Sequence, residues 1–335
     1  MKTIAVKNLD RPCSPICFGT AGFGGEKIPE SSALRLLDVW RDVGGTIVDT
    51  ANVYGRWVDG SNMGEKIIGK WLATRGKYSL TVATKCCHWS PDAPEISRVR
   101  EHCAKADIEE SLGALGLDCA DVCWLHRDDE DVPVDEIIGF CEEFRSRGLI
   151  RYYGLSNWSS DRFCKAYELC ESKGYKGLIG VQNGHAAAVV SDKAMEKGDK
   201  TLRFYTPDQG EIHRKSGIAE FPYSAIGNGV FCIMDAANVR VSGGKVISVG
   251  DESKISDDFA ARWFSERNLK RYGLLRHYAS EYGMSVFEAC VAFHTSRDYT
   301  DIPVIATSRE LGIYEIAAAA EKTLPLEIIK EIEEL

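Results

Sequence analysis

The sequence predicts an α/β protein, a single closed (β/α)8 barrel, from three observations. Eight short apolar runs bounded by turn residues alternate with longer segments whose apolar residues recur at helical spacing. The runs are apolar throughout, which is typical of strands buried on both faces of a parallel sheet. The chain has 335 residues, a length usual for such barrels. No linker or low-complexity tract interrupts the order, so we expect one barrel domain over residues 1–335, with its active site in the loops at the C-terminal face.

Each element follows from local composition. Residues 46–50 read Thr-Ile-Val-Asp-Thr, which is rich in β-branched side chains. After the first run, apolar side chains fall three and four residues apart, at Ala33, Leu36, Leu37 and Trp40. In order, the strands and the helices after them are 15–19 and 31–40, 46–50 and 63–72, 80–84 and 97–115, 120–125 and 134–147, and 150–154 and 161–172. The last three strands are 178–181, 219–223 and 302–305, and a final helix spans 314–320.

Two stretches break the rhythm. Residues 200–215 are polar with embedded aromatic side chains, and we expect them to extend the helix after the sixth strand. Residues 227–263 are long and contain Gly243-Gly244. Such a segment after the seventh strand is either a lid over the active face or a surface excursion.

A doubly wound sheet is the competing architecture, and it would favour a glycine-rich phosphate-binding turn after its first strand. The turn here reads Gly-Thr-Ala-Gly-Phe-Gly-Gly from Gly19. Counted from Gly22, the third glycine position of a G-x-G-x-x-G motif is Lys27. The turn therefore favours the barrel.

Composition excludes several classes of function. Forty-one basic and 50 acidic residues give a net charge of −9, and no dense basic run occurs, so we expect no nucleic-acid partner. No apolar run has a membrane helix's length of about 20 residues, and residues 1–7 lack the pattern of a signal peptide. These observations predict a cytoplasmic protein without a membrane partner, and they predict no oligomeric state.

The cysteines and histidines do not predict a metal site. The 12 cysteines include no C-x-x-C pair, and the 7 histidines are dispersed. Most cysteines lie in apolar runs, where reduced thiols behave as small apolar side chains. We therefore expect a reducing compartment and no bound metal.

Polar side chains follow nearly every predicted strand, at the end where barrel enzymes place their chemistry. They are Asp49 with Tyr54, Lys85, His126, Ser156 with Asn157, Gln182 with Asn183, Tyr223 with Ser224, and Thr307 with Ser308. Because the carboxyl ends of parallel strands meet at one face, these side chains together predict a lined pocket.

Four of these side chains could together act as a general acid: Asp49, Tyr54, Lys85 and His126. A phenol has a pKa of about 10, too high for efficient proton donation at neutral pH. An ammonium nearby lowers that pKa, and Asp49 would hold Lys85 in its charged form. We expect His126 to orient a substrate carbonyl.

These residues resemble a known family. Residues 48–55, Val-Asp-Thr-Ala-Asn-Val-Tyr-Gly, are similar to the D-T-A-x-x-Y-G segment of the aldo-keto reductases. Further segments resemble the family's later motifs, in order and at family spacing: Thr84-Lys85, Trp124-Leu125-His126-Arg127, Gly154-Leu155-Ser156-Asn157, Val181-Gln182-Asn183 and Tyr223-Ser224-Ala225-Ile226-Gly227. The resemblance implies a barrel that binds NADP(H) without a separate nucleotide-binding domain and reduces aldehydes or ketones.

The resemblance also implies residue roles. Tyr54 would protonate the carbonyl oxygen, Lys85 and Asp49 would tune it, and His126 would orient the substrate. The nicotinamide would be held by Ser156, Asn157 and Gln182, with Tyr223 stacked on it. Gly19 and Thr20 are taken as further cofactor contacts. Two positions depart from the family: Gly312 and Ile316 stand where it usually has polar adenosine contacts, and Gly184-His185-Ala186-Ala187 replaces a commoner aromatic-polar stretch.

NADP(H) is the predicted cofactor, with NAD(H) as the alternative. Thr307, Ser308 and Arg309 lie between the last strand and the last helix, and a helix N-terminus with a guanidinium favours a phosphate. Glu310 beside them weakens the positive field and suits an unphosphorylated ribose.

Three functions are compatible with these residues. The first is an NAD(P)H-dependent carbonyl reductase or alcohol dehydrogenase acting on an aldehyde, a ketone or a sugar-like carbonyl. The second is a non-catalytic nicotinamide-binding regulatory subunit on the same barrel. The third is a lyase in which Lys85 forms a Schiff base, which needs a depressed lysine pKa. Trp57 and Trp89 are candidate substrate contacts, since aromatic rings stack on sugars.

Overall fold

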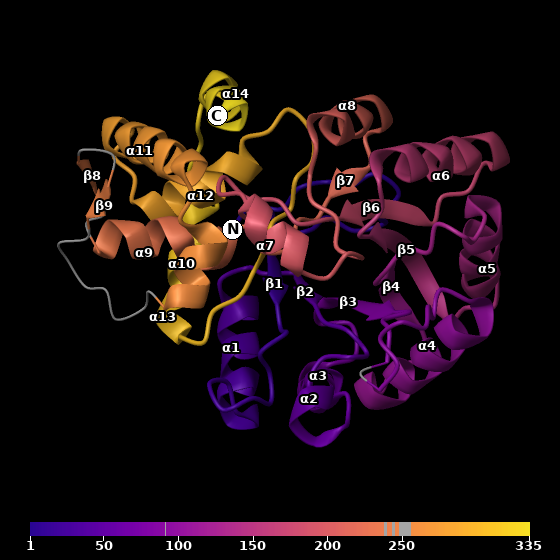
Figure 1. The fold of residues 1–335 in the computed structure, drawn as a ribbon. Coiled ribbons are helices and arrows are strands. Elements are labelled where there is room, and N and C mark those ends of the chain that lie inside the picture. The colour runs from indigo at the N-terminus through magenta and orange to yellow at the C-terminus, as the bar shows by residue number, and fades with distance from the viewer. Residues whose placement is uncertain (91, 238–239, 243–244, 248–255) are drawn as a thin grey trace.

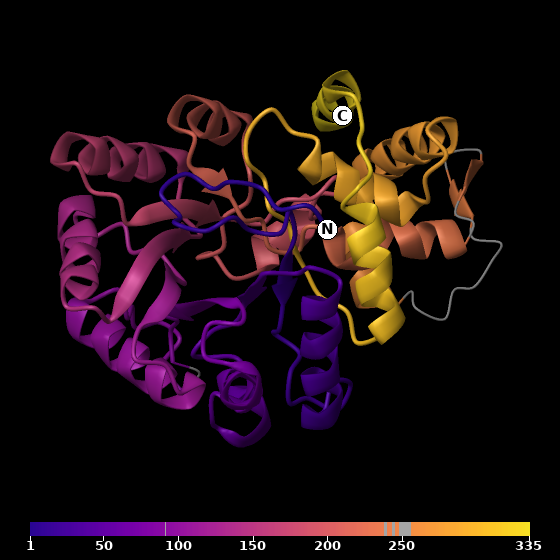
Figure 2. The same cartoon turned by 180° about the vertical axis from the view of Figure 1, so that it is seen from behind.

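The computed structural model describes residues 1–90, 92–237, 240–242, 245–247 and 256–335. Eight parallel strands form a ring that helices surround, and Figures 1 and 2 show it from opposite sides. The strands are β1 (Cys17–Gly19), β2 (Ile47–Asp49), β3 (Thr81–Cys86), β4 (Ala120–Leu125), β5 (Ile150–Ser156), β6 (Leu178–Gln182), β7 (Ala219–Glu220) and β10 (Val304–Ile305). Neighbours in the sheet follow the order β10-β1-β2-β3-β4-β5-β6-β7.

The two ends of this order meet through backbone contacts. Glu220 forms a parallel bridge with Asp301. The N–H of Ile302 donates to the carbonyl of Glu220 at 2.9 Å, and the N–H of Val304 donates to that of Pro222 at 2.9 Å. The ring is therefore closed, which confirms the predicted barrel and excludes an open doubly wound sheet.

Helices surround the ring of strands, and the helices α9 to α11 lie together on one side of it (Figure 1). Those between β1 and β7 are α1 (Glu30–Asp42), α2 (Arg56–Asp59), α3 (Met63–Arg75), α4 (Glu101–Leu115), α5 (Val134–Ser146), α6 (Ser160–Lys173), α7 (Asp192–Lys197) and α8 (Pro207–Ser216). Those after β7 are the 3-10 turn η1 (Gly227–Gly229), α9 (Val230–Ala236), α10 (Asp257–Trp263), α11 (Glu266–Glu281), α12 (Val286–Thr295), α13 (Glu310–Ala319) and α14 (Leu326–Glu334). A small antiparallel pair, β8 (Arg240–Ser242) and β9 (Lys245–Ile247), lies beside α9 and α11 (Figure 1).

Large side chains fill the inside of the barrel. The rings of Trp124 and Phe221 contact edge to face, with centroids 5.1 Å apart. A Cβ at Gly154 would lie 2.1 Å from the Trp124 ring, so this strand position admits only glycine. Val6 and Cys13 belong to the same apolar cluster, and Figure 2 shows the N-terminal segment crossing this end of the barrel. The opposite end is left for the site.

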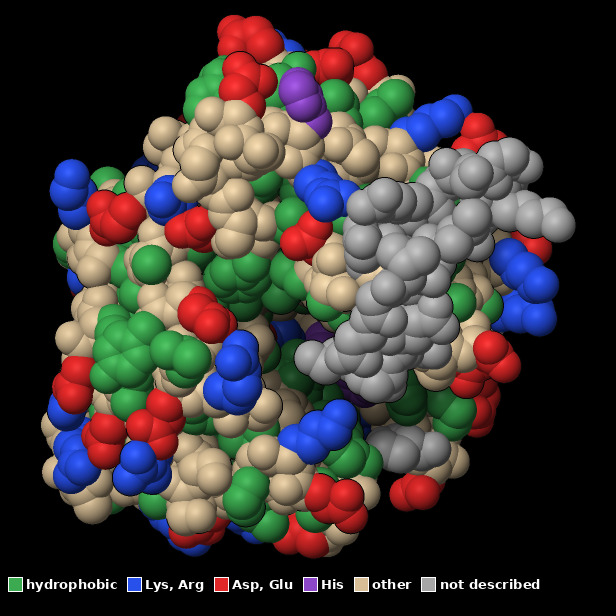
Figure 3. Space-filling view, turned by 90° about the vertical axis from the view of Figure 1, so that its left-hand side faces the viewer, with side chains coloured by type: hydrophobic (Ala, Val, Ile, Leu, Met, Phe, Trp, Pro, Cys, Tyr) green, Lys and Arg blue, Asp and Glu red, His purple; other side chains and the backbone are tan. Residues whose placement is uncertain are grey.

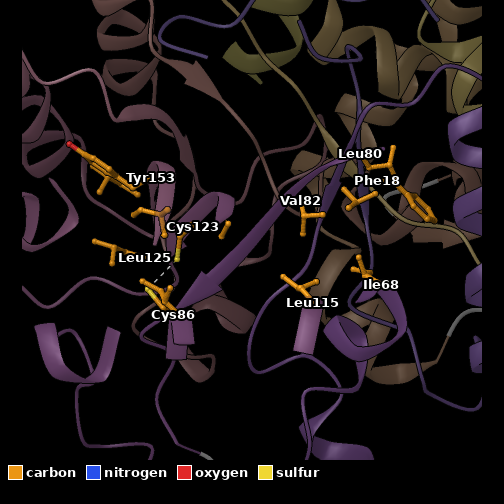
Figure 4. Packing of buried hydrophobic residues seen from close by; sticks show 14 of the residues in the cluster. Phe18, Ile68, Leu80, Val82, Cys86, Leu115, Cys123, Leu125 and Tyr153 are labelled. Atoms are coloured by element: carbon orange, nitrogen blue, oxygen red, sulfur yellow. Dashed lines mark hydrogen bonds between the residues drawn. The ribbon is translucent and has the colours of Figure 1, made fainter. Parts of the chain in front are cut away.

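A second apolar layer lies between the strands and the outer helices. Ile68 of α3 and Leu115 of α4 lie beside Val82 of β3 in Figure 4. All three side chains are buried. Because these helices pack against the sheet through such contacts, they position β3 and, with it, Lys85 near the end of that strand.

The structure has a strand at each of the eight predicted positions, and it differs in the connections. Residues 200–215 are helical only from Pro207, so the predicted extension of the helix is wrong in its first half. Residues 203–205 instead run beside Gly184, whose N–H donates to Arg203 O and whose carbonyl accepts from Tyr205 N, both at 2.9 Å. Pairing with the chain after β6 holds this segment extended.

Residues 227–263 contain η1, α9, the β8–β9 pair and α10. Part of this segment, residues 238–239, 243–244 and 248–255, lies outside the described residues, and with it part of the prediction of a lid or a surface excursion. Its first residues line the site cavity described below. Of the described helices, none combines the length and the apolar character needed to cross a bilayer.

Candidate active site

Four predicted side chains meet at the C-terminal ends of β2, β3 and β4. The Lys85 ammonium donates to Asp49 Oδ1, and to the carbonyl of Thr50 at 2.8 Å. Lys85 Nζ also lies 5.2 Å from the centroid of the Tyr54 ring. The rings of Tyr54 and His126 are edge to face with centroids 5.9 Å apart. The predicted quartet is therefore one cluster.

The loop after β2 places Tyr54 through backbone contacts. The N–H of Asn52 donates to the carbonyl of Lys85 at 3.1 Å, which ties the loop to β3. Gly55 has a φ of 94°, and a Cβ there would lie 2.5 Å from that of Met63. Only glycine fits this turn. The position of the phenol thus depends on the glycine that follows it.

Burial decides the protonation of Tyr54 and His126. Desolvation raises the pKa of the Tyr54 phenol, and Lys85 lowers it by less, so the net pKa lies above its ordinary value. The expected net lowering by Lys85 is therefore wrong for this structure, because the cost of burying a phenolate exceeds the attraction of the ammonium. Burial, with Arg127 and His88, holds the pKa of His126 well below its usual range. His126 is neutral at physiological pH.

Lys85 keeps its charge. Burial alone would lower the pKa of the ammonium, but Asp49 and the other groups around it raise it, and the net pKa lies above the ordinary value. A Schiff-base lysine needs the opposite shift. The electrostatics of the cluster therefore disfavour the lyase alternative.

These side chains open into a cavity of about 550 Å³ at the C-terminal face of the barrel. Its walls come from the ends of all eight strands and from the loop after β7: Gly19, Thr20, Ala21, Asp49, Tyr54, Lys85, His126, Arg127, Ser156, Asn157, Gln182, Leu202, Tyr223, Ser224, Ala225, Ile226, Asn228, Gly229, Val304, Ile305 and Ala306. In the space-filling view, the displayed face is hollowed near its centre, with basic and histidine side chains inside (Figure 3).

The predicted nicotinamide contacts lie along one wall of this cavity. Asn157 Nδ2 donates to His126 O at 3.0 Å and to Ser156 Oγ at 3.2 Å. Its Oδ1 accepts from Arg203 N at 3.0 Å and from Tyr223 Oη at 2.8 Å. Both donors and both acceptor positions of the Asn157 amide are therefore occupied within the protein.

Gln182 spans the bottom of the cavity. Its Nε2 donates to Asp49 Oδ2 at 2.8 Å, while Lys85 occupies the other carboxylate oxygen. The backbone carbonyl of Gln182 accepts from Ser156 Oγ at 2.8 Å. On the opposite wall, Thr20 Oγ1 donates to Asp49 O at 2.8 Å. The hydrogen bonds of the cavity floor thus join β1, β2, β3, β5 and β6.

Thr307, Ser308 and Arg309 do not line this cavity. They precede α13, and Ser308 and Arg309 are exposed. Arg309 Nη2 donates to Glu315 Oε2 at 2.9 Å, so an acidic side chain already holds the guanidinium. A Cβ at Gly312 would lie 2.2 Å from Thr307 Oγ1, which explains why a polar side chain is absent there.

The two tryptophans differ in their positions. Trp57 is exposed and its ring centroid lies 6.1 Å from that of Tyr54. Trp89 lines a separate polar cavity of about 520 Å³ between the loops after β2 and β3. Lys85 lines both cavities, so the second cavity adjoins the cluster of Asp49, Tyr54, Lys85 and His126.

Arg127 and His88 belong to the site and were not among its predicted residues. Arg127 donates to His126 O at 2.9 Å, to Asp199 Oδ2 at 3.3 Å and to His88 Nε2 at 3.2 Å. Since His88 Nδ1 faces Trp89 O at 2.9 Å, His88 carries its proton on Nδ1, and burial lowers its pKa to about 4. Arg127 could have been predicted from the sequence, because it directly follows His126.

One other cluster has the composition of a metal site. Ligand atoms of His185, His294 and Asp301 lie within 4.8 Å of one another. Arg297 lies among them, with Nε 3.2 Å from Asp301 Oδ2 and Nη2 3.1 Å from His185 Nε2. A guanidinium in this position supplies the positive charge that a metal ion would bring.

Comparison with known proteins decides the family. The model of the Aldo/keto reductase family matches residues 15–335. The chain belongs to this family.

Two relatives and one solved structure are informative. An uncharacterized oxidoreductase, YrpG, of Bacillus subtilis (strain 168) is 31% identical over 186 residues, covering 52% of this chain and 54% of the relative. The chain thus spans about half the length of that relative. A probable voltage-gated potassium channel subunit beta of Oryza sativa subsp. japonica is 24% identical over 340 residues, covering 98% of this chain and 95% of the relative. The crystal structure of the thermostable aldo-keto reductase Tm1743 with the inhibitor epalrestat has a TM-score of 0.70 at 19% identity, covering 100% of this chain and 99% of that one, and supports the fold.

Proposed function

We propose that this chain is an NAD(P)H-dependent reductase of aldehydes, ketones or sugar-like carbonyls, or an alcohol dehydrogenase in the reverse direction. The observation that carries the proposal is the cluster of Asp49, Tyr54, Lys85 and His126 at one end of a cavity of about 550 Å³. We further propose residues 1–335 as one functional domain, because strands from both ends of the chain build that cavity.

The cavity fits a nicotinamide group. A carboxamide-bearing ring needs hydrogen-bonding partners and a flat wall, and Ser156, Gln182 and the half-buried Tyr223 line one side. Gly19 and Thr20, at the end of β1, line the other side of the cavity. A Cβ at Gly19 would lie 3.1 Å from Val304, which also lines the cavity, and would narrow it. When bound, the reduced nicotinamide would supply the hydride. Since Asn157 is fully hydrogen-bonded within the protein, its role in this proposal is to fix Tyr223 and Ser156.

In the proposed reaction, the chain's residues handle the proton and the substrate oxygen. Tyr54 gives its phenolic proton to the carbonyl oxygen, and the phenolate that forms is stabilised by the charged Lys85. The ion pair with Asp49 keeps the ammonium in place through the transfer. Neutral His126 donates a hydrogen bond to the same oxygen, and it cannot replace Tyr54 as the acid, because its low pKa leaves the imidazole without a second proton at physiological pH.

NADP(H) over NAD(H) is the finer part of the proposal. Thr307, Ser308 and Arg309 come before α13 and offer hydroxyls and one cation to a 2′-phosphate, beside the first N–H groups of that helix. Binding would require Arg309 to exchange Glu315 for the phosphate, which an exposed ion pair permits at small cost.

The experiment that tests the function is a panel of aldehydes, ketones and aldoses assayed with NADPH and with NADH. We expect turnover of at least one carbonyl class. Borohydride added with a carbonyl substrate should trap no covalent adduct on Lys85, and trapping would favour the lyase.

A non-catalytic nicotinamide-binding regulator is the second candidate. It is favoured by the channel subunit from rice, whose similarity covers 98% of this chain. Tight cofactor binding without turnover across the whole panel would favour this candidate.

A further inference from the structure

A second cavity lies outside the catalytic site. It has a volume of about 260 Å³ and is bordered by the chain after β6 with α7, by the segment before α8, and by α10, α11 and α14. In Figure 1, α7 and α10 lie on the same side of the barrel as α9 and α11. Ser224 lines both cavities, so the second lies directly behind the loop after β7.

A buried cation without a counter-ion lines this cavity. Arg271 of α11 is only 4% exposed. In the described part of the chain, no carboxylate oxygen lies within 4.0 Å of the Arg271 guanidinium, so Arg271 forms no ion pair there. Its guanidinium donates to the carbonyls of Ala187 at 3.0 Å and of Glu333 at 2.9 Å. A guanidinium has five N–H groups, so most of its donors have no acceptor among the described residues, and Nε is one of these.

Glu333, one of the two acids that line the cavity, is already engaged elsewhere. Glu333 Oε1 accepts from Arg297 at 2.6 Å and lies 3.4 Å from His185 Nε2. Arg267, one turn before Arg271, adds a second positive charge to the same wall. Burial, together with Arg267, lowers the pKa of Arg271 to about 10, as is typical of a cation that is not neutralised. Buried arginines are rare unless an anion pairs with them.

The rest of the lining is largely apolar and limits the charge of a ligand. Val189, Val190, Trp263 and Phe204 contribute side chains to the walls. The carboxylates of Asp192 and Glu333 on the walls disfavour a dianion. A planar monoanion that can take two parallel N–H groups matches the remaining donors of a guanidinium.

We propose that this cavity is a second ligand site, and that it binds a small monocarboxylic acid with an apolar body, whose carboxylate pairs with Arg271. The apolar part lies against Val189, Val190 and Trp263. The site is independent of the proposed reductase activity, since neither Arg271 nor Val190 lines the catalytic cavity.

The test measures binding to the full chain by calorimetry, with benzoate and 3-phenylpropionate as probes. Their amides and inorganic phosphate serve as ligand controls. We expect both acids to bind, and we expect the amides and phosphate to bind at least about tenfold more weakly, because each lacks either the charge or the apolar body. Failure of both acids to bind, or equal binding of acids and amides, overturns the proposal. Phosphate binding as tightly as the acids overturns it as well.

Two variants locate the ligand. Arg271→Gln removes the positive charge, and Val190→Phe fills the cavity while keeping that charge. Each should weaken binding of the acids at least about tenfold. Arg276→Gln on the same helix, whose guanidinium pairs with Asp235 at the surface, should leave it unchanged. Unchanged binding in Val190→Phe overturns the proposal even if Arg271→Gln fails to fold.

Discussion

At the residue scale, the site is a balance between burial and one ion pair. Desolvation raises the pKa of Tyr54, while Lys85 opposes that rise and is itself kept charged by Asp49. Geometry at the ends of three strands is readable from sequence, because parallel strands end at one face. The sign of the pKa shift is not, because it depends on how deeply the fold buries the phenol.

Lys85→Met should impair the reaction in a characteristic way. Without the ammonium, the Tyr54 pKa rises further, so the pH at which alcohol oxidation becomes fast should move upward and neutral-pH reduction should fall. The pH profile of kcat in both directions measures this. Lys105→Met, at a half-buried position on α4, is the matched control. A Lys85→Met enzyme with the wild-type profile would remove Lys85 from its tuning role.

Arg309→Ala tests cofactor choice. If Arg309 binds the 2′-phosphate, the variant should lose affinity for NADPH by about tenfold or more and keep its affinity for NADH. Dissociation constants of both cofactors, measured by fluorescence, give the ratio. Arg147→Ala, which breaks an exposed pair with Glu143 at the end of α5, is the control. A ratio unchanged by Arg309→Ala, or equal wild-type affinities, contradicts the assignment.

Several site contacts could not be predicted from sequence. Asn157 is saturated by partners from Arg203 and Tyr223, 46 and 66 residues further along the chain. The Gln182–Asp49 hydrogen bond joins residues 133 positions apart. Local patterns carry no information on such pairs, whereas the family motifs do locate the side chains themselves.

At the element scale, apolar runs predict the strands well and periodicity misses several helices. The helices α9 to α12 and α14 are absent from the prediction, because long polar stretches such as the 16 residues of α11 obscure the apolar face. Capping signals were present in three of them. Ser256 caps α10, Ser265 caps α11, and Ser285 with Glu288 forms a complete capping box at α12. Start signals are therefore more informative here than periodicity.

Ser285→Ala should destabilise the protein by about 1 kcal/mol, since the N-cap hydroxyl satisfies a helix N–H that the variant leaves unpaired. Denaturant unfolding measures the change. Ser172→Ala, which removes an exposed hydroxyl bonded to Leu169 within α6, should stay within about 0.5 kcal/mol of wild type. Equal stabilities of Ser285→Ala and wild type would show that the capping box contributes nothing.

At the scale of the whole molecule, a buried acid makes stability depend on pH. Glu65 of α3 is fully buried, accepts from the Thr84 hydroxyl and from Asn62 at 2.8 Å, and has no cationic partner in the described part of the chain. Burial raises its pKa from 4.5 to about 7. When folding raises the pKa of a carboxyl group, the resulting stabilisation is fully present at pH values below the pKa of the unfolded state. It is lost as the pH rises through the pKa of the folded state.

Glu65→Gln should remove this dependence. Relative to the variant, the wild type should lose about 3 kcal/mol of unfolding free energy between acidic pH and pH about 8. Unfolding of both proteins at several pH values gives the difference, and the exposed Glu109→Gln on α4 is the control. A constant difference across pH would show that Glu65 does not titrate in this range.

The central claim is that Tyr54 is the proton donor of a carbonyl reductase, and Tyr54→Phe tests it most directly. With a carbonyl substrate found in the panel, kcat should fall by about 10²–10⁴-fold, because the variant lacks the phenolic hydroxyl that supplies the proton. The cofactor dissociation constant should stay within about twofold, because the change does not touch the proposed nicotinamide contacts. The exposed Tyr78→Phe should behave as wild type. A Tyr54→Phe enzyme with near wild-type kcat would contradict the account.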